Sequence, residues 1–181
     1  MLKLLSPSEV QPSVHAIDLL ALARRGIRFL LVDLDNTLAE VDTLTVSRDI
    51  ARWVRGAEEQ GFRLLILSNS LPRRVKAFEQ QLGVPALSKA VKPLPSAFWR
   101  ALDHLGAQPH ETAVVGDQLF TDVLGGNRLG LYTILINPLS RVELTHTRLI
   151  RFVERRVLDA LRRRNYISER DWAIRCGGGT C

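Results

Sequence analysis

The sequence feature that most constrains the fold is an apolar run, Phe29 to Val32, that ends in two aspartates one residue apart. The run is typical of a strand buried on both faces, as in a parallel sheet. In open α/β sheets, ligands bind outside the carboxyl ends of the strands, and Asp33 and Asp35 fall at that position. Two neighbouring carboxylates can hold a cation or supply a nucleophile beside an acid. Because Asp also favours ordinary turns, the D-x-D pattern alone leaves both interpretations open.

Four more apolar segments predict strands, and segments with helical spacing lie between them. This alternation predicts an α/β fold with a doubly wound, Rossmann-like parallel sheet of five strands and right-handed crossovers. Ser13 and Ser47 are the expected N-caps of the first two helices. The later predicted strands are 62–67, 84–87, 112–116 and 131–136, and the predicted helices are 14–25, 48–60, 72–82 and 94–105.

Length and composition indicate one domain with a core of its own, since 46% of the 181 residues are hydrophobic. The sequence has no run of 18 apolar residues that could span a membrane and no secretory signal pattern, so the cytoplasm is the expected location. Cys176 and Cys181 lie in a Gly-rich end without metal-binding spacing. We therefore predict neither a metal site nor a disulfide framework there, but a flexible end.

Polar residues follow the later predicted strands as well. In a doubly wound sheet they can converge with the first two aspartates on one crevice. Their types suit phosphoryl transfer, which uses a nucleophile, an acid, positive charge on the phosphoryl oxygens and a magnesium ion. Each has a plainer interpretation, because Ser and Asn are common turn residues and lone lysines are usually solvated. The residues are Ser68 and Asn69, Lys92 (preferred to Lys89 because Pro93 follows it at a predicted helix start), and Asp117 with Asp122.

These motifs, in this order, resemble the haloacid dehalogenase superfamily, and more closely the capless YqeG family of phosphatases in subclass IIIA. They are also similar to phosphatidylglycerophosphate phosphatases of mitochondria and plastids. The resemblance covers residues 1–165. It rests on Asp33-Leu-Asp-Asn-Thr-Leu, Leu67-Ser-Asn, Lys92-Pro and Gly116-Asp-Gln-Leu-Phe-Thr-Asp, with weaker likeness at Gly125-Gly-Asn-Arg-Leu-Gly and Val153-Glu-Arg-Arg.

The resemblance implies a phosphatase that works through a phosphoaspartate. Asp33 would attack phosphorus, and Asp35 would protonate the leaving group and then activate the water that hydrolyses the intermediate. Thr37 would support the loop, and Lys92 would also assist catalysis by holding phosphoryl oxygens. The implied substrate-binding residues are Thr37, Ser68, Asn69 and Lys92.

The resemblance also implies a Mg²⁺ cofactor. The ion would be held by the Asp33 carboxylate, the backbone carbonyl of Asp35 and the carboxylate of Asp117, with Asp122 orienting a metal-bound water. Hard oxygen ligands of this kind suit magnesium, which usually keeps several waters.

The spacing between the motifs leaves no room for a cap domain. Only 30 residues separate Thr37 from Ser68, and 22 separate Asn69 from Lys92. In the superfamily that the chain resembles, inserted caps usually select small substrates. An open site suits a substrate that is large or presented on a surface, such as a phospholipid head group.

The C-terminal segment is basic, with ten basic and five acidic side chains in residues 141–181. We predict one phosphatase domain in 1–165, a basic amphipathic helix at 141–164 within it, and a tail at 166–181. The helix could lie on an anionic membrane surface. Alternatively, its apolar stripe could pack on the sheet with solvated arginines outside, and both could hold together.

Three functions are compatible with the sequence. The first is hydrolysis of phosphatidylglycerophosphate to phosphatidylglycerol, at the cytoplasmic face of a membrane. The second is hydrolysis of a soluble phosphomonoester, a nucleotide or a phosphoprotein. The third is binding to RNA or the ribosome through the arginine-rich segment. The intact set of nucleophile, acid, lysine and metal aspartate argues against the third as the sole function.

Overall fold

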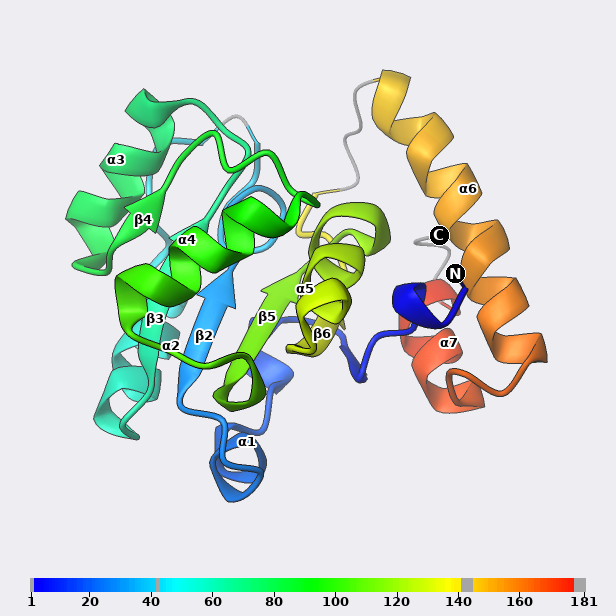
Figure 1. Cartoon of the computed structure of the whole chain (residues 1–181). Coiled ribbons are helices and arrows are strands. Elements are labelled where there is room, and N and C mark those ends of the chain that lie inside the picture. The colour runs from blue at the N-terminus through cyan, green and yellow to red at the C-terminus, as the bar shows by residue number, and fades with distance from the viewer. Residues whose placement is uncertain (1, 42, 141–144, 178–181) are drawn as a thin grey trace.

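The structure is a computed structural model in which residues 2–41, 43–140 and 145–177 are described. Within these residues, six parallel strands form one sheet in the order β1-β6-β5-β2-β3-β4. Helices cover both faces of the sheet, which makes the fold a doubly wound α/β sandwich as predicted (Figure 1). The strands are β1 (Glu9–Gln11), β2 (Phe29–Val32), β3 (Arg63–Leu67), β4 (Ala86–Leu87), β5 (Thr112–Gly116) and β6 (Tyr132–Ile136).

Strand β1 is an addition to the five predicted strands. It lies at the edge of the sheet and pairs with β6, with Val10 opposite Leu135. Of its three residues only Val10 is buried. A segment this short has no periodic pattern from which a strand could have been predicted, and its pairing depends on a partner more than 120 residues away.

The two faces of the sheet bury alternate residues of each strand, because successive side chains point to opposite sides. In β2, Leu30 and Val32 belong to the core of one face and Leu31 to the core of the other. Residues 29–32 are thus enclosed by helices on both sides, as the apolar run predicted. The first face carries α1 (Leu19–Arg24), α2 (Arg48–Glu59) and α3 (Pro72–Leu82), and the second carries α4 (Pro95–Leu105) and α5 (Leu124–Leu129).

The predicted caps have different outcomes. The Ser47 hydroxyl accepts the Ile50 N–H at 3.2 Å and begins α2 as expected. The prediction that Ser13 caps a helix over 14–25 is wrong. Residues 14–16 form a single 3₁₀ turn, Ile17 is extended, and α1 begins after Asp18, whose carboxylate accepts the Ala21 N–H at 2.9 Å. Asp and Ser are equally favoured as N-caps, so residue type alone could not show that the helix begins at Asp18 and not at Ser13.

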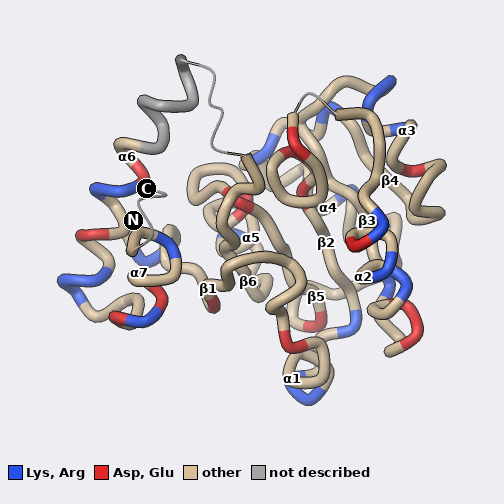
Figure 2. Tube along the Cα trace, turned by 180° about the vertical axis from the view of Figure 1, so that it is seen from behind, with Lys and Arg blue, Asp and Glu red and all other residues tan. Residues whose placement is uncertain are grey.

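The C-terminal part contains two helices, α6 (Thr145–Arg163) and α7 (Glu169–Cys176), beside the β1 edge of the sheet (Figure 1). Helix α6 corresponds to the predicted basic helix, of which residues 141–144 lie outside the described residues. Its Leu158 and Leu161 are buried, so the described part packs on the body of the protein. Arg155, Arg156 and Arg163 of this helix are exposed, and Figure 2 shows Arg positions along the coloured part of α6. None of the described helices is both long and apolar enough to cross a bilayer.

Residues 166–177 differ from the predicted tail. Ser168 and Asp171 form a capping box that begins α7, and the side chains of Arg175 and Cys176 at its end are buried. The Ser-x-x-Asp pattern is a known signal for a helix start, and it could have predicted this helix. Cys176 is disulfide-bonded, so the expectation that this end carries no disulfide is wrong. Cys181 lies outside the described residues.

Candidate active site

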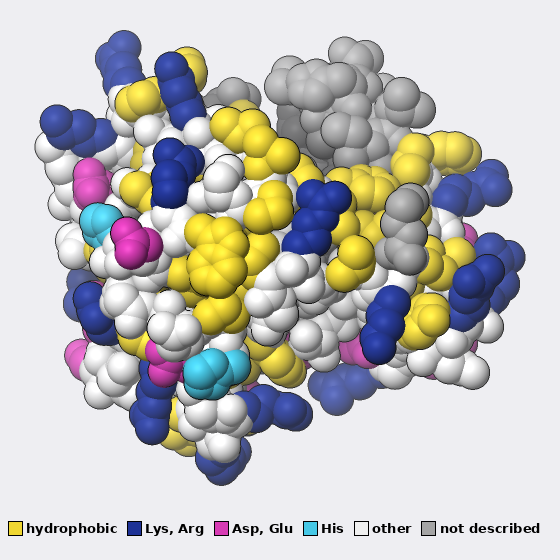
Figure 3. Space-filling view, in the orientation of Figure 1, with side chains coloured by type: hydrophobic (Ala, Val, Ile, Leu, Met, Phe, Trp, Pro, Cys, Tyr) yellow, Lys and Arg dark blue, Asp and Glu magenta, His cyan; other side chains and the backbone are white. Residues whose placement is uncertain are grey.

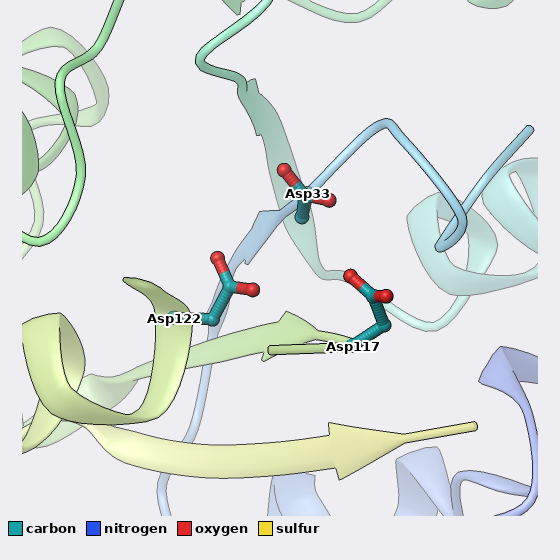
Figure 4. Close-up of side chains that lie close together, drawn as sticks. All are labelled: Asp33, Asp117 and Asp122. Atoms are coloured by element: carbon teal, nitrogen blue, oxygen red, sulfur yellow. The ribbon is translucent and has the colours of Figure 1, made fainter. Parts of the chain in front are cut away.

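Three buried carboxylates meet at the carboxyl edge of the sheet. Asp33 directly follows β2, Asp117 directly follows β5, and these two strands are neighbours in the sheet. Asp122 lies in a π-helical turn, Leu119–Val123, that follows β5. Each of the three offers a carboxylate oxygen within 4.8 Å of the others. Figure 4 shows the side chains converging on one space, which is a suitable site for a cation.

The Asp122 side chain packs against the backbone of Gly116, the last residue of β5, and this contact requires a glycine there. A Cβ atom on Gly116 would lie 2.3 Å from the Asp122 carboxyl carbon, which is too close for any other residue without displacing that side chain. Asp122 Oδ2 accepts hydrogen bonds from the Gln118 N–H at 3.3 Å and the Thr121 hydroxyl at 3.2 Å. The Gly-Asp-x-x-x-x-Asp pattern therefore sets the position of the second aspartate as well as its presence.

Lys92 lies among the carboxylates. Its Nζ donates to Asp33 Oδ1 and to Asp122 Oδ1, each at 2.6 Å, and its side chain is 3% exposed. Asn69, which we expected to bind substrate, holds the backbone of Lys92: its Oδ1 accepts the Lys92 N–H at 2.8 Å and its Nδ2 donates to the Lys92 carbonyl at 3.3 Å. The competing Lys89 is exposed. The preference for Lys92 over Lys89 agrees with this placement.

Burial changes the protonation equilibria of these groups. Loss of hydration raises the pKa of Asp33 to about 8; Lys92 opposes this rise, and the carboxylates of Asp122 and Asp117 reinforce it. Burial on its own lowers the pKa of Lys92, but the negative charges of Asp122 and Asp33 outweigh it and raise that pKa above its ordinary value. Three carboxylates around one ammonium group leave the site with an excess of negative charge, which a divalent cation would neutralise.

Asp35 lies outside this cluster and has partners of its own. Its Oδ1 accepts from Arg74 Nε at 2.8 Å, and its Oδ2 accepts from the Ser70 hydroxyl. Arg74 also donates to the backbone carbonyls of Glu40 and Thr43 in the loop after β2. Arg74 therefore fixes both the carboxylate and the loop that carries it. The sequence analysis missed Arg74, although its position in the first turn after Ser68-Asn-Ser places it beside the site.

The two remaining predicted residues, Ser68 and Thr37, are fully buried. Ser68 directly follows β3, and its hydroxyl accepts the Ser70 N–H at 3.0 Å. Thr37 lies in the turn after Asp35, where its Oγ1 has no hydrogen-bond partner among the described residues. Asn36 adopts a left-handed conformation (φ 59°) at this turn, which Asn tolerates better than most residues. The tight turn explains why polar residues follow the D-x-D pattern.

The C-terminal helices support the loop that contains Asp117. Arg175 of α7 is 1% exposed and donates to the backbone carbonyls of Asp117 at 2.7 Å and Ile136 at 2.6 Å. It forms an ion pair of 3.6 Å with Glu154 of α6, and Glu154 Oε1 accepts the Leu119 N–H at 2.7 Å. The sequence analysis assigned no role to either residue. Arginines are mostly solvated, and no local pattern distinguishes one that is buried by distant partners.

The fold and the site together define a class of enzyme. A parallel α/β sheet that presents a buried aspartate, a lysine and two more aspartates at its carboxyl edge suits phosphoryl transfer. The model of the haloacid dehalogenase-like hydrolase family matches residues 12–130. The chain belongs to this family, and the predicted phosphoric monoester hydrolase of the haloacid dehalogenase type is confirmed.

Within the family, the chain is similar to the "Probable phosphatase YqeG" of Bacillus subtilis. The two are 40% identical over 165 residues, which is 91% of this chain and 96% of the relative. A second relative is the mitochondrial phosphatidylglycerophosphatase GEP4 of Saccharomyces cerevisiae, 30% identical over 77% of this chain and 86% of the yeast protein. The resemblance to the YqeG family and to phosphatidylglycerophosphate phosphatases is thereby confirmed.

Among solved structures, a subfamily III A hydrolase of the haloacid dehalogenase superfamily from Legionella pneumophila has the same fold. The TM-score is 0.50 at 22% identity, with coverage of 64% of this chain and 68% of the Legionella chain. The likeness extends to the fold alone.

Proposed function

We propose that this phosphatase is Mg²⁺-dependent and converts phosphatidylglycerophosphate to phosphatidylglycerol at the cytoplasmic face of a membrane. The observation that carries the proposal of a catalytic centre is the position of Lys92, 2.6 Å from both Asp33 and Asp122 at the carboxyl edge of the sheet. The similarity to a yeast phosphatidylglycerophosphatase over most of both chains supports the lipid substrate.

In the proposed reaction, a carboxylate oxygen of Asp33 forms a bond to phosphorus as the bond to the glycerol oxygen breaks. Asp35 gives a proton to that oxygen, and the alcohol leaves. A water then attacks the phosphoaspartate, Asp35 takes its proton, and phosphate is released with Asp33 regenerated. Lys92 and Ser68 would receive the phosphoryl oxygens, and Asn69 would act indirectly by fixing the backbone of Lys92.

The donor set fits a hard divalent cation, because three buried carboxylates lie within 4.8 Å of one another. Asp33, Asp117 and Asp122 would hold the ion, and Asp35 would contribute only through its backbone carbonyl, since its carboxylate is bound to Arg74. Bound Mg²⁺ would supply positive charge against the phosphoryl oxygens. With the cation in place, Lys92 would be freed to pair with the phosphoryl group.

Cation binding should depend on pH through Asp33. Below about pH 8, the Asp33 carboxyl group of the cation-free protein holds a proton that the cation has to displace. The apparent Mg²⁺ affinity should therefore rise about tenfold for each pH unit between 6 and 8 and level off above. Calorimetric titration in buffers of different ionisation enthalpy would measure the affinity and the released proton. In Asp33→Asn the remaining binding should lose this dependence, and wild-type affinity that is constant over this range would contradict the assignment.

The substrate is tested by phosphate release with Mg²⁺ present. We expect phosphatidylglycerophosphate in mixed detergent micelles to be hydrolysed far faster than soluble sugar phosphates, nucleotides and phosphopeptides. The reason is that a site without a cap domain has no lid to enclose a small substrate. Activity confined to the soluble esters would exclude the lipid substrate and leave a phosphatase of soluble phosphomonoesters, the second candidate.

A further inference from the structure

Exposed apolar side chains are concentrated at the end of the molecule that carries the site. Among the described side chains, twelve large hydrophobic ones are exposed. Half of them lie in loops that follow the carboxyl ends of strands: Val41 and Leu44 after β2, Leu71 after β3, Val91 and Leu94 after β4, and Leu139 after β6. In the view of Figure 1 these strand ends point upward, and Figure 3 shows hydrophobic side chains beside Lys and Arg on the face over α4 and toward that edge.

Leu71 and Val91 directly adjoin residues of the site in the sequence, and Leu94 lies two positions after Lys92; we call these three residues the apolar rim. Leu71 follows Ser70, which donates to Asp35, and Val91 precedes Lys92. Their exposures are 67% for Leu71, 59% for Val91 and 50% for Leu94. The apolar rim therefore lies at the mouth of the site and not at a distance from it.

Two rim leucines occupy positions where leucine does not favour the fold. Leu71 and Leu94 are the N-cap residues of α3 and α4, and neither helix has a side-chain cap bond. Helices α1, α2 and α7 are capped by Asp or Ser side chains. Leucine is among the poorest N-cap residues, and an exposed leucine gains nothing from burial in the monomer. These two side chains are best explained by a contact with something outside the chain.

The exposed charge around the rim is mostly positive. Residues 69–100 contain one acidic side chain, Glu79, and six basic ones, of which Arg74 and Lys92 are paired with carboxylates of the site. The other four are exposed: Arg73, Lys76, Lys89 and Arg100. Arg73 and Lys89 are exposed next to Leu71 and Val91, and Arg128 of α5 reaches the rim by donating to the Pro93 carbonyl at 3.2 Å. Apolar side chains that protrude among basic ones are complementary to the surface of an anionic bilayer. The apolar side chains can enter the acyl region, and the basic ones can pair with the lipid phosphates.

We propose that the apolar rim and its basic neighbours dock the protein on an anionic lipid bilayer, with the site facing the membrane. The inference rests on the proposed lipid substrate and specifies how that substrate is reached: the phosphomonoester head group stays in the membrane and enters the open site from below. It also differs from docking through α6, because the buried side chains Glu154, Leu158 and Leu161 turn that face of α6 toward the body of the protein.

The test uses the double substitution Leu71→Ser/Leu94→Ser. Serine is a preferred N-cap, so the variant should be as stable as the wild type or more so, which thermal unfolding checks. Binding is measured by co-sedimentation with vesicles of equal parts phosphatidylglycerol and phosphatidylcholine. We expect the double variant to bind at least about tenfold more weakly, because two side chains that would enter the acyl region are lost. The control is Leu20→Ser on α1, a leucine of similar exposure (62%) at the opposite end of the strands, which should leave binding unchanged.

A second variant tests the electrostatic contribution. Arg73→Glu lies in the exposed first turn of α3, where a negative charge suits the helix dipole, and it should weaken vesicle binding more at low salt than at high salt. Both variants should hydrolyse phosphatidylglycerophosphate in detergent micelles like the wild type. Equal vesicle binding by the wild type and both variants would overturn the docking surface. The docking surface would also be overturned if the wild type did not bind vesicles but hydrolysed the lipid in micelles. That outcome would not contradict the proposed substrate. If the wild type did not hydrolyse phosphatidylglycerophosphate in micelles, the proposed function itself would be refuted.

Discussion

Replacing Asp33 by Asn is expected to lower phosphate release by about ten-thousandfold or more, because an amide cannot attack phosphorus and the chemical step has no alternative nucleophile. Asp33 also supplies one of the three carboxylates of the candidate cation site, so its replacement should lower the Mg²⁺ affinity as well. The fold should persist, since Lys92 retains its ion pair with Asp122. Single-turnover phosphate release and thermal unfolding of the same preparation would measure both effects.

The matched control is Asp35→Asn, which changes a carboxylate two positions away in the same loop. Its loss should slow hydrolysis by about 10²–10⁴-fold, the range expected for a general acid. Mg²⁺ affinity should change little, because the Asp35 side chain is bound to Arg74 and Ser70 and not to the carboxylate cluster. With a substrate that has a good leaving group, this variant should accumulate acid-stable, hydroxylamine-sensitive phosphoenzyme, and Asp33→Asn should not. Phosphoenzyme in Asp33→Asn, or near-normal turnover by it, would refute the assignment of Asp33 as nucleophile.

The sequence predicted much of this site because the topology does most of the placement. Asp33 and Asp117 each directly follow an apolar run that becomes a strand, and parallel strands end at the same edge of a sheet. Two such residues are therefore neighbours whenever their strands are neighbours. The glycine of the Gly116-Asp motif then accommodates Asp122. Lys92 needed a further inference, because only its Pro93 neighbour distinguished it from Lys89.

What the sequence did not predict depends on distant partners or on very short segments. Strand β1 has one buried residue, so its pairing with β6 has no local signal. Asn69 fits a substrate-binding position by type, but its amide is occupied by both backbone groups of Lys92, a contact across 23 residues. Arg74 has the pattern of a solvated residue in an amphipathic helix. Its position after Ser68-Asn-Ser indicates that it lies near the site, but its contact with Asp35 spans 39 residues and has no local signal.

The pair formed by Glu154 and Arg175 leads to the largest stability effect that we expect. Substituting Glu154 by Ala should lower the free energy of unfolding by about 3–5 kcal/mol, because Arg175 stays buried without this carboxylate and the Leu119 N–H loses its acceptor. Urea unfolding in the absence of Mg²⁺ would measure the change. The matched control is Glu169→Ala, which removes the ion pair between Glu169 and Arg162 of the same two helices. In this pair the Arg162 side chain is 33% exposed and the Glu169 side chain is 80% exposed. It should cost less than about 1 kcal/mol, and equal losses in the two variants would contradict a buried pair.

A third variant separates stability from positioning of the site. Replacing both partners by apolar residues of similar size, as in Glu154→Leu/Arg175→Met, removes the buried charges together and should restore much of the lost stability. It cannot restore the hydrogen bonds to the Asp117 carbonyl and the Leu119 N–H, which hold the loop between two of the candidate cation ligands. Mg²⁺ affinity should therefore remain low in the double variant although the protein unfolds at nearly the wild-type urea concentration. If affinity recovers together with stability, the C-terminal helices hold the fold and not the geometry of the site.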